Sequence, residues 1–239
     1  MNLIIDIGNS LVKTAVFNKE TFVETNIFKD TDLEEVVALN KKKYNLKNCI
    51  LSSVTDTVTV HNKEFLFDNF ITLYYNTPVP FINKYATPTT LGVDRMALVS
   101  AAAVHYPNKN VLVIDTGTCI TYDFLNKKNE YLGGGISPGL FMRYKAVNHY
   151  TAKLPLLKPF DNQLIGDSTD SSIHSGIVNG LRAEIDGIIN QYHQEFRNLT
   201  VVLTGGDAIF LAKKLKSSIF AKPNFLLAGL NSILIFNSK

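Results

Sequence analysis

The stretches that decide the fold are LIIDIGNS at residues 3–10 and VLVIDTGTC at residues 111–119. In both, a short apolar run ends in an Asp, a Gly follows two positions later, and a second strand-like run begins after the turn. Each stretch therefore predicts a β-hairpin closed by a tight Gly turn. Because the pattern repeats after 109 positions, we expect two related α/β domains, over residues 1–108 and 109–239.

In the rest of each half, the spacing of the apolar residues predicts a series of helices and strands. In the first half we expect helices over 32–44, 65–70 and 94–105, strands over 48–51 and 71–74, and an extended Pro-rich connection over 77–88. In the second half we expect a long helix over 171–196, a strand over 200–203, the turn TGGDA at 204–208 and a helix over 209–215.

The composition excludes several classes of protein. With 239 residues, 46% of them hydrophobic, the chain can bury a core and is not disordered. A formal net charge of +3 without an Arg-rich stretch argues against nucleic-acid binding, and Cys49 and Cys119 lack the CxxC spacing of a zinc site. The N-terminus has no basic signal region, and no run approaches the ~20 apolar residues that cross a bilayer, so we expect a cytoplasmic protein without membrane contact.

A strand that ends in Asp and a Gly turn is suited to phosphate binding. Gly lets a phosphate approach the backbone N–H groups closely, and the carboxylate of Asp6 offers a hard oxygen to a divalent cation. Lys13 adds a positive charge after the same turn. Taken alone, DIGNS is equally compatible with a plain hairpin turn. The second copy and the TGGDA turn favour a phosphate clamp built from three Gly turns.

The segment LGVDR at residues 91–95 places a carboxylate and a guanidinium at the start of an expected helix. Asp94 is compatible with a helix N-cap, which accepts backbone hydrogen bonds. That interpretation leaves Arg95 near the positive end of the helix dipole, where a cation is disfavoured. An anionic partner, such as a substrate carboxylate, explains Arg95 better, and Asp94 is then a candidate general base toward a substrate hydroxyl.

The glycine-dense segment GGGISPG at residues 133–139 predicts a close approach of the backbone to another group. That group is either another part of the protein or a ligand, and the sequence does not distinguish the two. The five histidines lack HExxH spacing, and neither the P-loop pattern nor GxGxxG occurs. The common zinc-protease, P-loop and dinucleotide-binding sites therefore lack support.

Six motifs follow one another in the order of a known family. They are DxGNSxxK at 6–13, PxxLGxDR at 88–95, IDxGT at 114–118, GGxIxPG at 133–139, TAxLP at 151–155 and TGG at 204–206. Together they resemble the type III pantothenate kinases, which belong to the superfamily of acetate and sugar kinases, heat-shock ATPases and actin. The resemblance runs from Asp6 to the AGLN tail at 228–231 and so covers essentially the whole chain.

The resemblance implies an α/β fold of two ribonuclease H-like domains with the active site in the interdomain cleft. It implies transfer of the γ-phosphate of ATP to the 4′-hydroxyl of pantothenate, the first step of coenzyme A synthesis. Magnesium and a monovalent cation, potassium or ammonium, are the implied cofactors. The implied assembly is a homodimer in which the partner subunit helps to enclose pantothenate.

Carried over residue by residue, the resemblance also assigns roles to the motifs. Asp94 is the expected general base, Asp6 the expected magnesium ligand and Asp115 the expected ligand of the monovalent cation. ATP and its phosphates are expected to contact Asp6, Gly8, Asn9, Ser10, Lys13, Thr118, Gly205 and Gly206. Pantothenate is expected to contact Tyr85, Gly92, Val93, Asp94, Arg95 and Thr169.

Two other functions are compatible with the same fold. One is an accessory regulator of transcription, as some relatives of the family have been described, and the other is a kinase of a different sugar or acid. The segment LGVDR together with Tyr85 argues against a different kinase, because a generic phosphate clamp does not require it. A regulator that had lost catalysis should lack some of the charged set, and the sequence keeps all of it: Asp6, Lys13, Asp94, Arg95 and Asp115. Ser10 and Cys119 are mild departures from the Thr and Ala common in the family.

Overall fold

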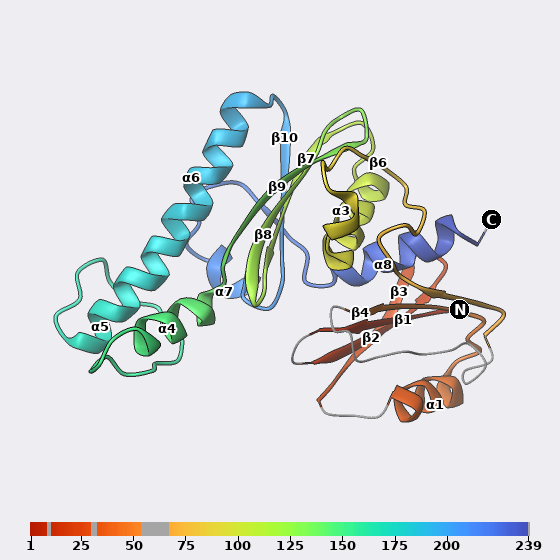
Figure 1. Ribbon diagram of the computed structural model, residues 1–239, viewed down its shortest axis with the longest axis horizontal. Coiled ribbons are helices and arrows are strands. Elements are labelled where there is room, and N and C mark those ends of the chain that lie inside the picture. The colour runs from red at the N-terminus through yellow and green to blue at the C-terminus, as the bar shows by residue number, and fades with distance from the viewer. Residues whose placement is uncertain (9–10, 30–32, 54–66, 239) are drawn as a thin grey trace. The chain divides into compact units, whose positions relative to one another are not determined.

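The computed structural model describes residues 1–8, 11–29, 33–53 and 67–238, which form two compact units (Figure 1). The first unit comprises Met1–Pro107, Asn129–Tyr131 and Asn224–Lys239. The second unit comprises Asn108–Lys128 and Leu132–Pro223.

A five-stranded sheet forms the centre of the first unit. Its strands are β1 (Asn2–Ile7), β2 (Val12–Asn18), β3 (Thr21–Phe28), β4 (Asn48–Ser53) and β5 (Asn69–Thr72). They lie in the order β3-β2-β1-β4-β5, with β1 antiparallel to β2 and parallel to β4. The central strand β1 is buried along its whole length, which explains why its sequence is an almost continuous apolar run. The first predicted hairpin is therefore present.

Helices cover both faces of this sheet (Figure 1). On one face, Val37 of α1 (Leu33–Lys43) packs in a cluster with Leu3 and Ile5 of β1. On the other face, α8 (Phe225–Phe236) contacts β1 and β4 and packs along α3 (Val93–His105). Because successive side chains of a strand point to opposite faces, Asp6 lies on the face that α8 covers.

The second sheet repeats the strand order of the first. Five of its six strands are β7 (Asn110–Thr116), β8 (Cys119–Leu125), β9 (Glu130–Pro138), β10 (Leu199–Thr204) and β11 (Phe220–Ala221). In the order β9-β8-β7-β10-β11 they correspond to β3-β2-β1-β4-β5, again with an antiparallel hairpin and a parallel fourth strand. The short β6 (Ile82–Asn83) pairs with the first two residues of β9, which belong to the first unit. The repeated sequence motif thus corresponds to a repeated topology.

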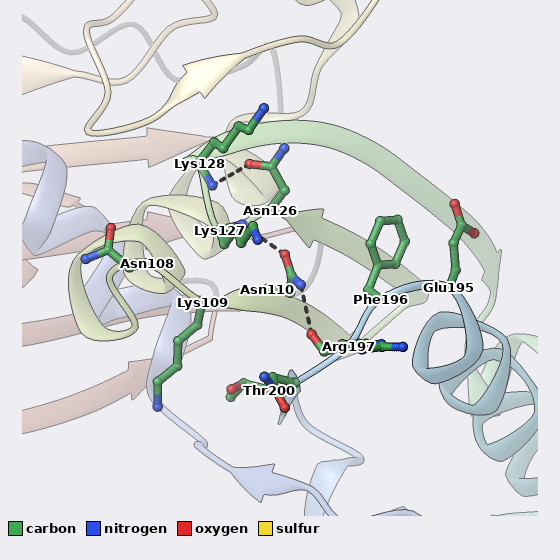
Figure 2. Close-up of a pocket in the computed structure, with 11 residues that line it drawn as sticks. Asn108, Lys109, Asn110, Asn126, Lys127, Lys128, Glu195, Phe196, Arg197 and Thr200 are labelled. Atoms are coloured by element: carbon green, nitrogen blue, oxygen red, sulfur yellow. Dashed lines mark hydrogen bonds between the residues drawn. The ribbon is translucent and has the colours of Figure 1, made fainter.

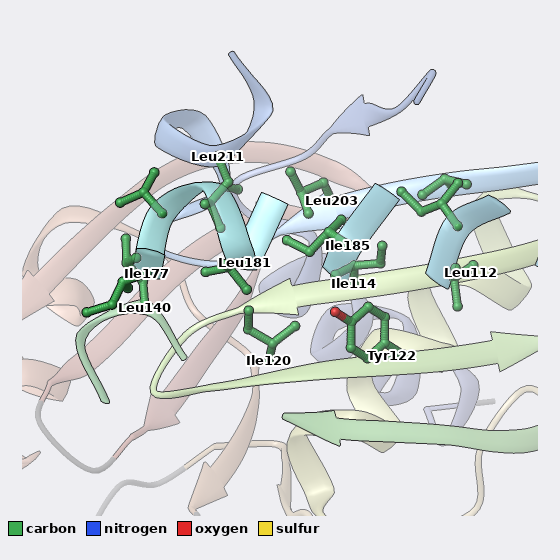
Figure 3. Packing of buried hydrophobic residues seen from close by; sticks show 14 of the residues in the cluster. Leu112, Ile114, Ile120, Tyr122, Leu140, Ile177, Leu181, Ile185, Leu203 and Leu211 are labelled. Carbon is green, nitrogen blue, oxygen red and sulfur yellow. The ribbon is translucent and has the colours of Figure 1, made fainter. Parts of the chain in front are cut away.

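A long helical segment covers the second sheet. It consists of α5 (Thr169–His174), a π-helical turn η2 (Ser175–Asn179) and α6 (Gly180–Glu195), close to the helix expected over 171–196. Figure 3 shows Leu181 and Ile185 of this helix packed over Ile114 of β7. The remaining helices of this unit are α4 (Leu140–His149) and α7 (Ala208–Ala212).

Three segments differ from the expectation drawn from the sequence. The helix expected over 209–215 ends at Ala212. Asn69 and Phe70 lie in β5, whereas a helix was expected over 65–70, of which residues 65 and 66 lie outside the described part. Asn69 and Phe70 form a strand because they pair in parallel with β4, which is a non-local interaction. The C-terminal segment from Asn224 folds with the first unit rather than with residues 109–223, because α8 packs against α3. Within the described residues, no helix is long and apolar enough to cross a membrane.

Candidate active site

The first hairpin and the start of α3 bring charged side chains together in the first unit. Asp6 and Lys13 are register partners on β1 and β2, so their side chains leave the same face of the sheet. Ser52 is the register partner of Asp6 on β4 and lies on that face as well. Asp94, in the first turn of α3, is near enough for its charge to act on Asp6.

The carboxyl group of Asp6 is held in an unfavourable environment for a charge. The residue is only 9% exposed, and burial raises the pKa of its carboxyl from the ordinary 3.8 to about 6. The positive charge of Lys13 opposes that rise in pKa, the negative charge of Asp94 adds to it, and the hydroxyl of Ser52 opposes it. A bound cation would stabilise the ionised carboxylate, so this environment suits a cation site.

The glycines that follow Asp6 and Asp115 each donate a backbone hydrogen bond across the hairpin they belong to. The N–H of Gly8 donates to the carbonyl of Leu11, and the N–H of Gly117 donates to the carbonyl of Cys119, each with 3.0 Å between N and O. Both glycines therefore close their hairpins as the repeated motif predicts. Asn9 and Ser10, the other expected phosphate contacts of the first turn, lie outside the described residues.

The LGVDR segment shapes the start of α3. The N-cap of the helix is Gly92, so the alternative that Asp94 is the N-cap is wrong. Asp94 lies in the first turn after Val93, and its Oδ1 accepts a hydrogen bond from the N–H of Arg95 at 2.8 Å. A Cβ on Gly92 would lie 2.4 Å from that Oδ1. Gly at position 92 thus permits the orientation of the Asp94 carboxyl.

The guanidinium of Arg95 lies over one aromatic ring. Its side chain is only 5% exposed, and the guanidinium carbon lies 5.6 Å from the centroid of the Tyr85 ring. The ring of Tyr85 in turn stacks on Tyr131, with centroids 5.9 Å apart and planes at 22°. A cation over an aromatic face is stabilised by the ring's quadrupole. The stack therefore accounts for a cation at a helix start and places Tyr85 beside Arg95.

In the second unit, the two Gly turns predicted from the sequence lie against each other. Gly205 has a φ of +95°, and a Cβ there would lie 2.4 Å from Oδ1 of Asp115 and 2.5 Å from the carbonyl oxygen of Thr116. The TGG turn after β10 is thus packed directly against the DTG turn after β7. The register partner of Asp115 on β8 is the neutral Thr121, whereas Asp6 faces Lys13. The two Asp residues therefore differ in the residue that lies opposite them in the hairpin.

The glycine-dense segment makes close backbone contacts inside the second unit. A Cβ on Gly134 would lie 1.6 Å from the carbonyl oxygen of Tyr122 in the neighbouring strand. A Cβ on Gly139 would lie 2.3 Å from the carbonyl oxygens of both Gly117 and Thr118. Of the two alternatives left open by the sequence, the approach to another part of the protein is therefore established, and it supports the DTGT turn.

Other expected contacts lie elsewhere in the second unit. Thr118 and Gly206 are exposed in their turns. Thr169 is the exposed first residue of α5, whose start is fixed by a reciprocal capping box between Ser168 and Ser171. It lines a pocket of about 670 Å³ with Leu154 and Gly166 among its other residues. Thr169 thus belongs to a different unit from Tyr85 and Arg95.

A larger pocket, of about 770 Å³, lies outside the candidate site (Figure 2). It is at the end of β7 opposite to Asp115, where the side chain of Asn110 donates to the carbonyl of Arg197 at 3.0 Å and accepts from the N–H of Lys127 at 2.9 Å. Lys109 and Lys128 line it but point in different directions. Since these cations do not converge, we assign the pocket no ligand.

The carboxylate of Asp6 is suited to a cation that is also bound by phosphate groups. Among the described residues, no three His, Cys, Asp or Glu side chains gather into a metal-binding group. Magnesium in nucleotide sites commonly takes one or two protein carboxylates and completes its shell with phosphate and water. The buried Asp6, next to Lys13, matches that pattern.

Sequence reasoning missed two residues of this region. Tyr131 supports Tyr85, and Ser52 lies beside Asp6. Neither belongs to a motif, and both reach the site through the pairing of distant strands or stacking of distant rings. A Ser at the end of a predicted strand was the only local signal for Ser52.

Comparison with known proteins agrees with this architecture. Residues 2–191 match the family model of type III pantothenate kinases. The type III pantothenate kinase of Christiangramia forsetii is 50% identical over 243 aligned residues, which cover 99% of each chain.

Solved structures extend the likeness to the fold. A conserved putative Baf family transcriptional activator from Campylobacter jejuni has a TM-score of 0.64 at 21% identity, covering 99% of this chain and 98% of that one. A glucokinase from an Antarctic psychrotroph has a TM-score of 0.55 at 13% identity, covering 98% of both chains. At these identities the likeness shows the fold alone.

Proposed function

This chain belongs to the type III pantothenate kinase family, and on that premise we propose which residues perform its reaction. The enzyme transfers the γ-phosphoryl group of ATP to pantothenate, giving 4′-phosphopantothenate in the first step of coenzyme A biosynthesis. The observation that carries the proposed roles is the grouping of Asp6, Lys13 and Asp94 in the first unit.

Asp94 is the general base in this proposal. The 4′-oxygen of pantothenate bonds to the γ-phosphorus, the bond from that phosphorus to the β–γ bridging oxygen breaks, and the hydroxyl proton passes to the Asp94 carboxylate. The N–H of Arg95 orients that carboxylate. Phosphoryl transfer depends mainly on positioning and charge neutralisation, which Lys13 and the turn at Gly8, Asn9 and Ser10 provide for the phosphates.

Two cations fit the strand-ending carboxylates. Asp6 would hold magnesium, which when bound neutralises charge on the phosphates. Asp115, which has the same penultimate position in β7 as Asp6 has in β1, would hold potassium or ammonium. The second unit contributes Thr118, Gly205 and Gly206 as further ATP contacts in this proposal.

Arg95 is the proposed partner of the pantothenate carboxylate. Its guanidinium is fixed over Tyr85, so little conformational freedom is lost when it binds an anion in a bidentate pair. Gly92, Val93 and Asp94 form the turn around the same substrate, Tyr85 contacts it directly, and Thr169 is the proposed contact from the second unit.

We further propose that the working form is a homodimer in the cytoplasm. The segment from β9 to the start of α5 exposes large apolar side chains, as surfaces that bind another protein do. These are Leu132, Ile136, Phe141, Met142, Tyr150, Leu156, Phe160, Leu164 and Ile165. Cys49 and Cys119 are free thiols, which agrees with a reducing compartment.

The proposal is tested by measuring ADP release from magnesium and ATP, with and without pantothenate, in potassium and then in sodium buffer. We expect release that requires pantothenate and is faster in potassium. ATP turnover that ignores pantothenate would overturn the substrate, and equal rates in both buffers would overturn the cation role of Asp115. Absence of turnover under every condition would instead favour a regulatory protein.

A further inference from the structure

One buried hydroxyl beside Asp6 has no role in the mechanism above. Ser52, on β4, is wholly buried, and its Oγ has no hydrogen-bond partner among the described residues. Most buried polar groups in proteins are hydrogen-bonded, because leaving one unpaired is unfavourable. A side chain of this kind inside a sheet therefore calls for an explanation.

The position of Ser52 is set by the pairing of β1 with β4. Ser52 and Asp6 are opposite each other in this parallel pair, so both side chains project from the same face of the sheet. The hydroxyl is near enough to the carboxyl group to favour its ionised form, although the two groups do not meet hydrogen-bond geometry.

Thr14 provides an internal comparison in the same sheet. It is also wholly buried, and its Oγ1 likewise has no partner among the described residues. Its register partner is Ile5, which belongs to the apolar cluster on the α1 face. Thr14 thus shares the burial and the missing hydrogen bond of Ser52 but points away from Asp6.

We propose that Ser52 is a positioning residue of the phosphoryl-transfer site, whose hydroxyl donates to the Asp6 carboxylate when magnesium–ATP is bound and so fixes the orientation of that carboxylate. The inference rests on the role proposed above for Asp6. Hydrogen bonds to an ionised acceptor are stronger than those between neutral groups. Residues that orient a metal ligand in this way contribute about 10–100-fold to metal affinity.

The test compares Ser52→Ala with Thr14→Val by calorimetric titration of ATP, with and without magnesium. We expect Ser52→Ala to weaken the binding of magnesium–ATP by about 10–100-fold while metal-free ATP and the KM for pantothenate stay unchanged. Thr14→Val should leave all three quantities unchanged. Ser52→Thr, which keeps the donor, should recover most of the affinity. Urea unfolding at pH 4, where the Asp6 carboxyl is protonated in the folded protein, should find Ser52→Ala no less stable than the parent, since an unpaired hydroxyl is removed.

Asp6→Asn separates this inference from the role of Asp6 itself. If Ser52 acts through the carboxylate, Ser52→Ala should have no further effect in the Asp6→Asn background. Full additivity of the two changes would overturn the role of Ser52 and leave that of Asp6 in place, as would equal behaviour of Ser52→Ala and Thr14→Val. Normal magnesium–ATP binding by Asp6→Asn would remove the role of Asp6 and that of Ser52 together.

Discussion

At the scale of single residues, the first unit keeps charged groups buried next to its most apolar strand. Asp6 is at the end of β1, Lys13 lies opposite it, and Arg95 is covered by Tyr85. Burial of charge is unfavourable unless it is compensated, so such groups are seldom retained for stability alone. The arrangement is typical of a site that binds charged ligands.

Asp94→Asn tests the general base. The amide keeps the size of the side chain but cannot take the hydroxyl proton, so we expect kcat to fall by about 10²–10⁴-fold. The far-ultraviolet circular dichroism and the unfolding midpoint should match the parent protein. Near-normal turnover would refute the assignment.

Arg95→Ala tests the proposed carboxylate partner. Removing the guanidinium should raise the KM for pantothenate far more than the KM for ATP, because only pantothenate is expected to contact it. Arg95→Lys should lie between the two, since an ammonium group does not pair with a carboxylate in bidentate fashion. An equal rise in both KM values would indicate that Arg95 has a structural role over Tyr85.

At the scale of elements, the close pairing of α3 and α8 holds the start of α3, and with it Asp94, on the sheet. A Cβ on Gly229 of α8 would lie 1.8 Å from the carbonyl oxygen of Ala97 in α3. The two helices therefore approach each other closely enough that only Gly fits at this position. Distortion here should be transmitted to the LGVDR turn.

Gly229→Ala should destabilise the protein, because one of the two helix backbones must move. Overpacking of this kind costs about 1–3 kcal/mol in the free energy of unfolding, measured by urea titration. Gly187→Ala in α6 is the matched control, since nothing lies within 4 Å of a Cβ there. That change should raise the stability by about 0.5–1 kcal/mol. Equal effects at the two positions would contradict the close packing of α3 and α8.

At the scale of the whole molecule, stability is linked to the ionisation of Asp6. Its carboxyl has a pKa of about 6 in the folded protein against an ordinary 3.8, so the folded state keeps a proton that the unfolded state has already released. Stability should therefore decrease as the pH rises from about 4 to 6 and then level off. The ionised carboxylate of Asp6 thus lowers the stability of the ligand-free protein at neutral pH. A bound cation would offset that loss.

Asp6→Asn should remove this dependence. A difference of about 2 pKa units corresponds to about 3 kcal/mol, so the variant should exceed the parent in free energy of unfolding by roughly that amount above pH 6. At pH 4 the two proteins should differ little. Urea titrations across this range check the prediction, and a constant difference at all pH values would contradict it.

The oligomeric state is the other property of the whole molecule that can be tested directly. Leu164→Asp with Ile165→Asp places charges on the exposed apolar segment, where both side chains are at least 80% exposed. We expect light scattering to find a dimer for the parent and a monomer for this variant, because burying the new carboxylates is unfavourable. Ile27→Asp, at an exposed position of β3, should remain dimeric. A monomeric parent would rule out the proposed homodimer.

Local patterns in the sequence determined those parts of the fold that depend on residues close together in the chain. The apolar runs before Asp6 and Asp115 and the glycines after them were sufficient for two hairpins, because turn chemistry and alternation act within a few residues. Helical periodicity was sufficient for α3 and for the long helix through α6. The motifs also indicated the family and its reaction.

Only the tertiary structure decided which distant residues meet. The parallel register of β1 with β4 places Ser52 beside Asp6, and the stacking of Tyr131 on Tyr85 supports Arg95. The assignment of α8 to the first unit and of Asn69 to a strand is non-local in the same way. No local signal fixes such pairings, because they depend on chain segments tens of residues apart and on the close packing of the faces that those segments bury.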